Sequence, residues 1–277
     1  MFKRDSAKAL KKVLGDYELP SFPGVVLQVL ERIRAEEASV ASVVECIELD
    51  PGLSVRILAA VNTAAYSPRS RVENLAQAVA MLGMATVESL ALAIAVGCTL
   101  PRPHCQGFEP RRFWLAAARR AAIARTLAKE LHPATRSEAF TAALLQDMAV
   151  PLLAACRASE YGKVLSSWHH AEGTLPELEH DALGFDHAMV ATWLCEAWQL
   201  PTSLSSAIGQ HHASPGAAAA CPPAVTLVAT LRETDEPDGV DDLVALTEQS
   251  FGLAADDVIA LVRSGFEEAE ELAPLFA

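Results

Sequence analysis

The chain has 277 residues, enough for one large domain or two small ones at about 150 residues per domain. With 51% hydrophobic and 21% charged residues, the composition excludes a collagen-like, disordered or disulfide-stapled small protein. The net charge is −13, of which −11 falls after residue 231, so the preceding body is nearly neutral. A body without excess positive charge argues against non-specific duplex binding, and we expect no nucleic-acid partner.

The cysteines and the N-terminus bear on the compartment. The six cysteines form no CxxC pair and most stand among apolar residues, as buried thiols in a reducing compartment do. The start of the chain has no signal-like apolar run. The longest apolar stretch, Leu90 to Leu100, is well short of the roughly 20 residues of a bilayer span. We expect a cytoplasmic protein with no membrane partner and no cofactor.

Helical spacing of apolar residues dominates the first third of the chain, and strand-like alternation is absent, so we predict an all-α fold. Pro23 suits the first turn of a helix within Ser21 to Glu37, Ser39 caps a second helix, and Asp50 with Pro51 starts a third. The remaining predictions are a short helix opened by Asn74 and closed by a left-handed Gly83, then an apolar central helix from Thr86 to Leu100.

A second set of helical patterns follows the Pro/Gly-containing run from Pro101 to Gly107. The predicted helices are Pro110 to Leu131, Ser137 to Asp147, Pro151 to His170, a Thr174-x-x-Glu177 capping box leading toward Gly184, Asp186 to Gln199 and Pro201 to His212. We expect two packed helical lobes.

The stretch from Ala213 to Pro223 reads as a loop, followed by a helix through Arg232 and an acidic pair, Val240 to Gly252 and Ala254 to Glu271. The predicted organisation is a basic N-terminal segment (1–17), an N-terminal lobe (18–105), a second lobe (106–215) and C-terminal helices with an acidic tail (216–277). The tail contains enough apolar residues to form amphipathic helices, which pack on the second lobe or dock a partner.

The informative histidines lie in the second lobe. His187 follows Gly184-Phe185-Asp186, the pair His211 and His212 ends a helix, and Asp147 stands upstream. Imidazole and carboxylate groups on converging helices are what a hydrolytic metal centre needs. The alternatives are that His187 merely begins a helix and that the pair lies at a solvated helix end.

Ordered short motifs make the chain similar to a known family. They are Leu19 to Pro23, Leu49-Asp50-Pro51-Gly52-Leu53, Val61-Asn62-Thr63, Ala78 to Gly83, Phe113-Trp114, Ala142 to Leu145, Gly184 to His187, Trp198 to Pro201 and Ala207 to His212. Residues 18 to 215 resemble the HDOD domain, a divergent relative of HD and HD-GYP phosphohydrolases. The resemblance implies a bundle whose second lobe is HD-like.

The resemblance also implies metal ligands that this chain lacks. Ala116 and Gln146 stand where the HD enzymes have histidines. We therefore predict no catalytic residues and expect no metal, with Asp147, His187, His211 and His212 as residual candidates. Asp147 is either a relic carboxylate that bonds a neighbouring helix start or one ligand of a mononuclear site.

Five other polar residues are candidates for ligand or partner binding. Asn62 either ties a helix end to the next loop or contacts a ligand, and Arg56 is a solvated charge or part of a partner-contact face. Arg112, Arg119 and Arg120 could share a phosphate-binding face, or form a solvated stripe that Arg125 and Lys129 extend.

Two hypotheses of function remain. The first is a bacterial signal-transduction module, not an enzyme, that regulates by binding a signalling protein partner; the resemblance implies a link to cyclic di-GMP or two-component pathways. The alternative is a degenerate HD-type phosphohydrolase with one metal, acting on a nucleotide or phosphodiester. The sequence identifies neither the partner nor the oligomeric state.

Overall fold

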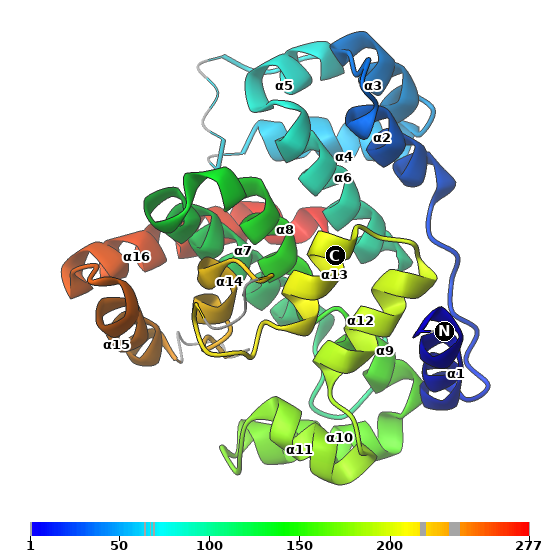
Figure 1. Ribbon diagram of the computed structural model, residues 1–277, viewed down its shortest axis with the longest axis vertical. Coiled ribbons are helices and arrows are strands. Elements are labelled where there is room, and N and C mark those ends of the chain that lie inside the picture. Colours follow the sequence, from blue (N-terminus) through cyan, green and yellow to red (C-terminus); the bar gives the residue numbers. More distant parts are fainter. Residues whose placement is uncertain are drawn as a thin grey trace.

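The computed structural model describes residues 2–63, 65–66, 68, 70–216, 220–232 and 239–276. These residues form helices and connecting segments and contain no strand, which confirms the predicted all-α class. Figure 1 shows a cap of short helices at one end, a central group of long helices, and the N- and C-terminal helices packed at the sides.

The described residues of the first lobe form five helices, and side-chain caps at Ser39, Asp50 and Asn74 fix where three of them begin. Ser39 and Ser42 form a reciprocal capping box, and the Asp50 carboxylate accepts a hydrogen bond from the Leu53 N–H at 3.0 Å. Pro23 precedes its helix instead of standing in the first turn, one residue outside the predicted position. The helices are α2 (Gly24–Arg34), α3 (Val40–Glu48), α4 (Pro51–Val61), α5 (Leu75–Leu82) and α6 (Met84–Thr99).

Gly83 differs from the prediction of a left-handed helix end. Its φ is 79° and its ψ is 159°, an extended backbone at positive φ that strongly favours glycine. The same residue ends α5 and precedes α6, and the two helices bend by 116° there. Gly83 in this conformation therefore leads the chain directly from α5 into α6. A left-handed cap would have been followed by a loop.

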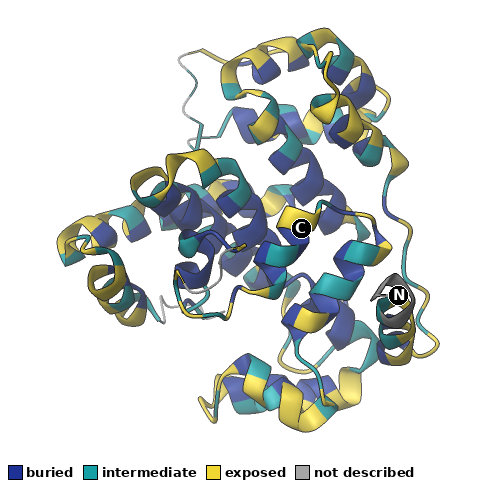
Figure 2. Ribbon diagram, viewed as in Figure 1, coloured by how far each residue is buried: buried dark blue, intermediate teal, exposed yellow. Residues whose placement is uncertain are grey.

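The helix α6 is the centre of the molecule, as its apolar sequence predicted. Its residues from 89 to 97 are buried, and it packs against α2, α4 and α5 of the first lobe and α8 of the second. Figure 2 shows the buried residues concentrated in this central region. A Cβ atom on Gly97 would collide with the carbonyl oxygen of Phe276, so glycine permits the C-terminus to pack against α6. The two lobes therefore share one core.

The second lobe begins with the long helix α7, whose bounds match the prediction. One predicted helix, Pro151 to His170, is two, because the chain breaks at Arg157. The helices are α7 (Pro110–Leu131), η1 (Pro133–Thr135), α8 (Arg136–Leu145), α9 (Ala149–Cys156), α10 (Ala158–His169), α11 (Leu175–Leu183), α12 (His187–Ala197) and α13 (Thr202–Gly209).

Part of this lobe is apolar enough to cross a membrane by length and composition alone. The segment Pro133–Cys156 meets that test, and 83% of its most apolar window is buried inside the fold; the bent pair α5 and α6 also passes. Core helices have this character, so the finding is weak support for a membrane span.

The N-terminal segment forms a helix, α1 (Phe2–Leu14), that the sequence analysis did not predict. Leu10, Val13 and Leu14 are buried where α1 packs against α9 and α12. The Arg157 guanidinium donates to the backbone carbonyls of Lys12 and Val13 at 2.8 and 3.0 Å. This segment is therefore part of the second lobe's packing.

The acidic C-terminal region packs on the body, as the first of the two alternatives predicted. The helix α16 (Ala255–Leu272) lies along α7, while α15 (Val240–Phe251) contacts α14 (Pro223–Val228) and α16. The chain then forms η2 (Ala273–Leu275), which contacts both α7 and α4. The tail thus covers the second lobe and reaches the first.

Candidate functional site

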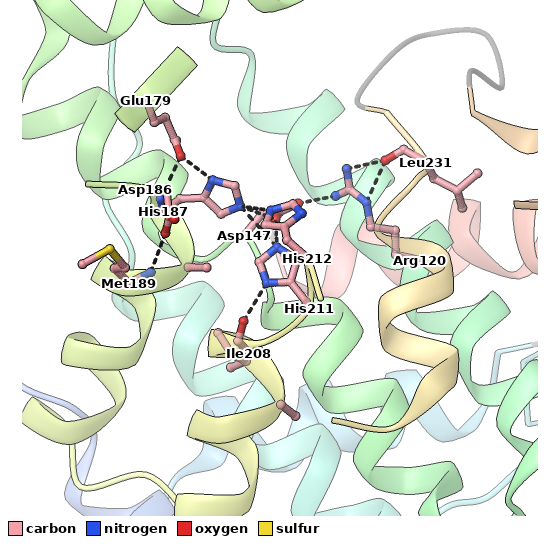
Figure 3. A network of polar contacts seen from close by, with 12 residues as sticks. Arg120, Asp147, Glu179, Asp186, His187, Met189, Ile208, His211, His212 and Leu231 are labelled. Atoms are coloured by element: carbon pink, nitrogen blue, oxygen red, sulfur yellow. Dashed lines mark hydrogen bonds and ion pairs between the residues drawn. The ribbon is translucent and has the colours of Figure 1, made fainter. Parts of the chain in front are cut away.

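Four of the predicted site residues converge in the second lobe. Asp147 follows the end of α8, His187 is the first residue of α12, and His211 and His212 follow α13. Figure 3 shows their side chains pointing toward one another from these separate elements. His187 and His211 are buried and Asp147 is 9% exposed, so the proposed solvated helix end is wrong for His211.

The distances between these side chains are short. The Nε2 atom of His187 lies 3.2 Å from Nε2 of His211 and 2.9 Å from Nε2 of His212. The Oδ1 atom of Asp147 lies 3.3 Å from Nε2 of His187 and 3.4 Å from Nε2 of His211. Asp147 thus contacts the His187 side chain and not the backbone of a helix start, which corrects the relic interpretation.

Two further acceptors fix the orientation of the buried imidazoles. The Oε2 atom of Glu179 lies 2.6 Å from Nδ1 of His187 and also accepts from the His187 backbone N–H at 2.7 Å. The Tyr161 hydroxyl donates to the other oxygen of Glu179. The Nδ1 atom of His211 lies 2.6 Å from the carbonyl oxygen of Ile208. Each Nε2 atom is therefore held toward Asp147.

The second carboxylate oxygen of Asp147 binds an arginine. Nη1 of Arg120, on α7, donates to Oδ2 of Asp147 at 2.6 Å, while Nε and Nη2 donate to the carbonyl of Leu231 at 3.1 and 2.8 Å (Figure 3). Arg120 is 5% exposed, so the prediction of a solvated stripe is wrong for it. A buried guanidinium bound to both partners is oriented by three charge-assisted hydrogen bonds.

These contacts shift the pKa of two side chains in opposite directions. Burial acts to raise the pKa of Asp147, but the positive charge of Arg120 and the hydrogen bonds from the histidines hold it well below its usual value. Burial acts to lower the pKa of His187, but Glu179 and Asp147 raise it to about 10. Asp147 is therefore an anion at neutral pH.

The residues do not fit the dinuclear metal centre of the HD enzymes. Ala116 is buried on α7 and offers no donor atom, and the buried Gln146 offers only a neutral amide oxygen, which has no hydrogen-bond partner. Nη1 of Arg120 donates to Oδ2 of Asp147, so this carboxylate oxygen is already bound by a protein cation. With these three positions unsuited to a cation pair, no hydrolytic step through two metals can be derived.

A pocket of about 240 Å³ adjoins the cluster. Asp147, His187, His212 and Arg120 line it, together with Gln146, Trp168, Thr174, Arg232 and Asp242. His212 is the most exposed histidine of the cluster. The pocket thus connects the buried nitrogen and oxygen atoms to the surface of the protein.

The two candidates of the first lobe have structural contacts. The Asn62 amide donates to the carbonyls of Leu58 and Val72 at 2.8 and 2.9 Å and accepts from the Val72 N–H at 2.8 Å, which confirms the predicted tie between helix and loop. Nη1 of Arg56 donates to the carbonyl of Leu275 at 2.7 Å. Arg56 is therefore a contact between the first lobe and the C-terminus, not a solvated charge.

The arginines of α7 do not form one phosphate-binding face. Arg119 lies 3.6 Å from Glu270 and over the ring of Phe266, both on α16. Arg125, predicted to be solvated, is buried and ion-paired with Glu268. Arg112 lies near the end of α10, where burial and then the charge of Arg112 lower the pKa of His169. The C-terminal helix, distant in sequence, covers much of this face.

Glu179 is the site residue that sequence reasoning missed. It lies on α11, two residues after the Glu177 of the predicted capping box, and is fully buried. A glutamate on a short polar helix reads as a solvated charge, because its partners Tyr161 and His187 belong to two other helices. The one sequence signal for Glu179 was its position eight residues before the candidate ligand His187.

Comparison with known proteins places the chain among bacterial relatives. It is 24% identical over 217 residues to an uncharacterized protein of Treponema pallidum, and this match covers 76% of the chain but 41% of that relative. The chain thus spans less than half the length of that relative.

Solved structures share the fold at low identity. An HDOD domain protein of unknown function from Geobacter sulfurreducens has a TM-score of 0.74 at 19% identity, covering 100% of this chain and 98% of that one. A candidate phosphohydrolase from Shewanella amazonensis SB2B gives 0.73 at 23%, covering 96% and 97%. A candidate signal transduction protein from Marinobacter aquaeolei VT8 gives 0.73 at 20%, covering 99% and 65%.

The family itself is shown by sequence. The profile of the HDOD domain matches residues 19–214, more than half of the chain and close to the span in which the motifs were found. This range contains both lobes and every residue of the histidine cluster. The chain belongs to the HDOD family.

Proposed function

We propose that this protein is a non-catalytic regulatory module that acts by binding a signalling protein partner. The observation that carries the proposal is the Arg120–Asp147 pair, in which a protein cation binds the carboxylate that a metal-dependent hydrolase would use to hold its metals. A metal-activated nucleophile requires an open coordination position and a carboxylate free to support it. Arg120 removes the second of these requirements.

Exposed apolar side chains of the first lobe support binding as the output. Leu49 is 66% exposed and Val55 is 67% exposed, on either side of the tight connection between α3 and α4. Val55 also lines a surface pocket of about 890 Å³ with Leu58 and Arg71. We place the docking surface of the partner here, because exposed apolar side chains mark sites of interaction. We expect the partner to be cytoplasmic and, as the family resemblance implies, to belong to a cyclic di-GMP or two-component pathway.

The alternative, a degenerate phosphohydrolase acting on a nucleotide or phosphodiester, has one observation in its favour. The pocket of about 240 Å³ adjoins His187, His212 and Asp147, so a small ligand could reach the cluster. The buried cluster has donors for only one ion, which is the arrangement that the alternative requires.

Hydrolysis assays separate the two functions. The full chain, supplied in turn with manganese, iron and zinc, is tested against p-nitrophenyl phosphate, bis-p-nitrophenyl phosphate and cyclic dinucleotides. We expect no turnover above that of the Asp147→Ala variant. Metal-dependent turnover that the Asp147→Ala and His187→Ala variants both lose would overturn the non-catalytic proposal.

A further inference from the structure

A second pocket, of about 370 Å³, lies where the two lobes meet. Among the described residues, it shares no lining residue with the pocket beside the histidine cluster. Its volume is in the range of sites that bind small molecules. The walls of this interlobe pocket include Tyr66, Met81 and Leu82 of the first lobe and Arg125, Arg136 and Phe140 of the second.

Two buried polar atoms of the pocket walls have no hydrogen-bond partner among the described residues. They are the hydroxyl of Tyr66 and Nη1 of Arg125. A buried donor without a partner loses its hydrogen bonds to water and gains none in exchange, which costs free energy. Because both side chains line the interlobe pocket, an acceptor that enters the pocket would satisfy both atoms.

The other contacts of Arg125 hold its guanidinium in place. Nη2 donates to the carbonyl of Ala65 at 3.1 Å and to the carboxylate of Glu268. The guanidinium carbon lies 4.9 Å from the centre of the Tyr66 ring and 5.6 Å from that of the Phe140 ring. Arg125 is 5% exposed. The guanidinium is therefore fixed by one nitrogen and two rings, while Nη1 remains available to a ligand.

The charges of the pocket favour an anionic ligand. Of the described residues that line it, two are arginines and none is acidic. The ion pair with Glu268 offsets the charge of Arg125, whereas the exposed Arg136 adds a further positive charge. Burial raises the pKa of Tyr66, so its hydroxyl keeps the proton and can donate it. Two donors and a net positive charge suit an oxyanion.

We propose that the interlobe pocket binds a small organic anion. Its oxyanion group accepts hydrogen bonds from Nη1 of Arg125 and from the Tyr66 hydroxyl, and its apolar part lies against Met81 and Leu82. A carboxylate and a phosphoryl group share this chemistry. The inference goes beyond the proposed function and does not depend on it, because no residue of the histidine cluster lines this pocket.

Titration of the full chain with three small probes tests the proposal. Benzoate and phenyl phosphate each carry an oxyanion group on an apolar ring, and benzamide has the shape of benzoate without its charge. We expect at least one of the two anions to bind saturably in calorimetry and to raise the melting temperature. Benzamide should bind about 10-fold more weakly than that anion. The anion that binds more tightly distinguishes a carboxylate site from a phosphoryl site.

Tyr66→Phe separates a binding role from a structural one. The variant keeps the ring beside Arg125 and removes a hydroxyl that has no partner in the folded chain. Its melting temperature should therefore be unchanged or higher, while its affinity for the anion should fall about 10-fold. A hydroxyl with only a structural role would show the opposite pattern.

A second variant tests the charge at the mouth of the pocket. Arg136→Gln removes an exposed positive charge that lines the pocket and should weaken anion binding by about 2–5-fold. Lys129→Gln is the matched control, because it removes an exposed positive charge from the last turn of α7, outside the pocket. It should bind the anion as the natural chain does.

Three results would overturn the proposal. A folded natural chain that binds neither anion would show that the two donors have no ligand of this class. Equal affinity for benzoate and benzamide would show that the pocket does not select charge. Anion binding that Tyr66→Phe and Arg136→Gln both leave unchanged would place the anion elsewhere. The hydrolysis assays are independent of these results, since a chain that binds no anion here can still be a non-catalytic module.

Discussion

The two lobes are built from similar helices but treat polar side chains in opposite ways. Among the described residues from 18 to 105, Ser89 is the one buried polar side chain, and the lobe is held by apolar packing and helix caps. The second lobe buries Arg120, Asp147, Glu179 and His187 among its apolar residues. Burying such charges costs free energy that pairing only partly offsets. The first lobe shows that such helices pack without buried charged side chains. We therefore infer that the second lobe keeps its buried charges for the candidate site and not for packing.

The largest expected effect comes from removing the segment that both lobes contact. Deletion from Val240 onward removes the cover of α7, including Val258, Val262, Leu272 and Phe276, all buried. Because burial of each such side chain contributes about 1.5–3 kcal/mol, we expect a loss of more than about 5 kcal/mol in unfolding free energy. Thermal unfolding measures the loss, and increased binding of a hydrophobic dye measures the exposed surface.

An unchanged melting temperature would contradict this packing. If the truncated chain also lost a partner, the tail would be a docking arm held away from the body. The contrast in buried polar side chains between the lobes would then arise only from the helices before residue 240.

The next largest effect is expected at the buried pair. Arg120→Met leaves the Asp147 carboxylate without its guanidinium and the Leu231 carbonyl without its donors, which should lower the unfolding free energy by about 3–5 kcal/mol. The neighbouring Arg119→Met is the control, because its partner Glu270 is 59% exposed at 3.6 Å and such pairs contribute less than about 1 kcal/mol. Denaturant unfolding compares the two. Equal losses of unfolding free energy in the two variants would mean that the buried Arg120–Asp147 pair stabilises the second lobe no more than an exposed pair does.

Most of the helices could be predicted because their signals are local. Ser39, Asp50 and the apolar spacing after them fix where helices begin, whatever packs on them later. The helix α1 carried such a signal in Leu10, Val13 and Leu14, but the segment was predicted only as a basic N-terminal segment. Gly83 was misjudged because the direct turn into α6 depends on where that helix packs.

The site could be predicted only in part. Asp147 and the three histidines were found from residue type and order, since a family motif preserves both. The roles of Arg120 and Arg125 could not be found, because α7 looks half solvated until α14 and α16, more than 90 residues later in the chain, cover it. Helices distant in the sequence bury a charge that the local sequence places on the surface, and no local pattern predicts this burial.

The smallest expected effect tests the first lobe. Asp50→Ala removes the carboxylate that accepts from the Leu53 N–H at the start of α4, which should lower the unfolding free energy by about 1 kcal/mol. Asp50→Asn keeps an acceptor and should lose less. Thermal unfolding of both variants measures the difference.

The same variant also tests whether the two lobes respond independently. Asp50 shares no partner with the histidine cluster, so the losses of unfolding free energy in Asp50→Ala and in Arg120→Met should add in the double variant. Denaturant unfolding of the two single variants and of the double variant measures the sum. A double variant whose loss differs from that sum would show that the cap at the start of α4 and the cluster are coupled through the shared helix α6, and the two lobes would then respond as a single unit.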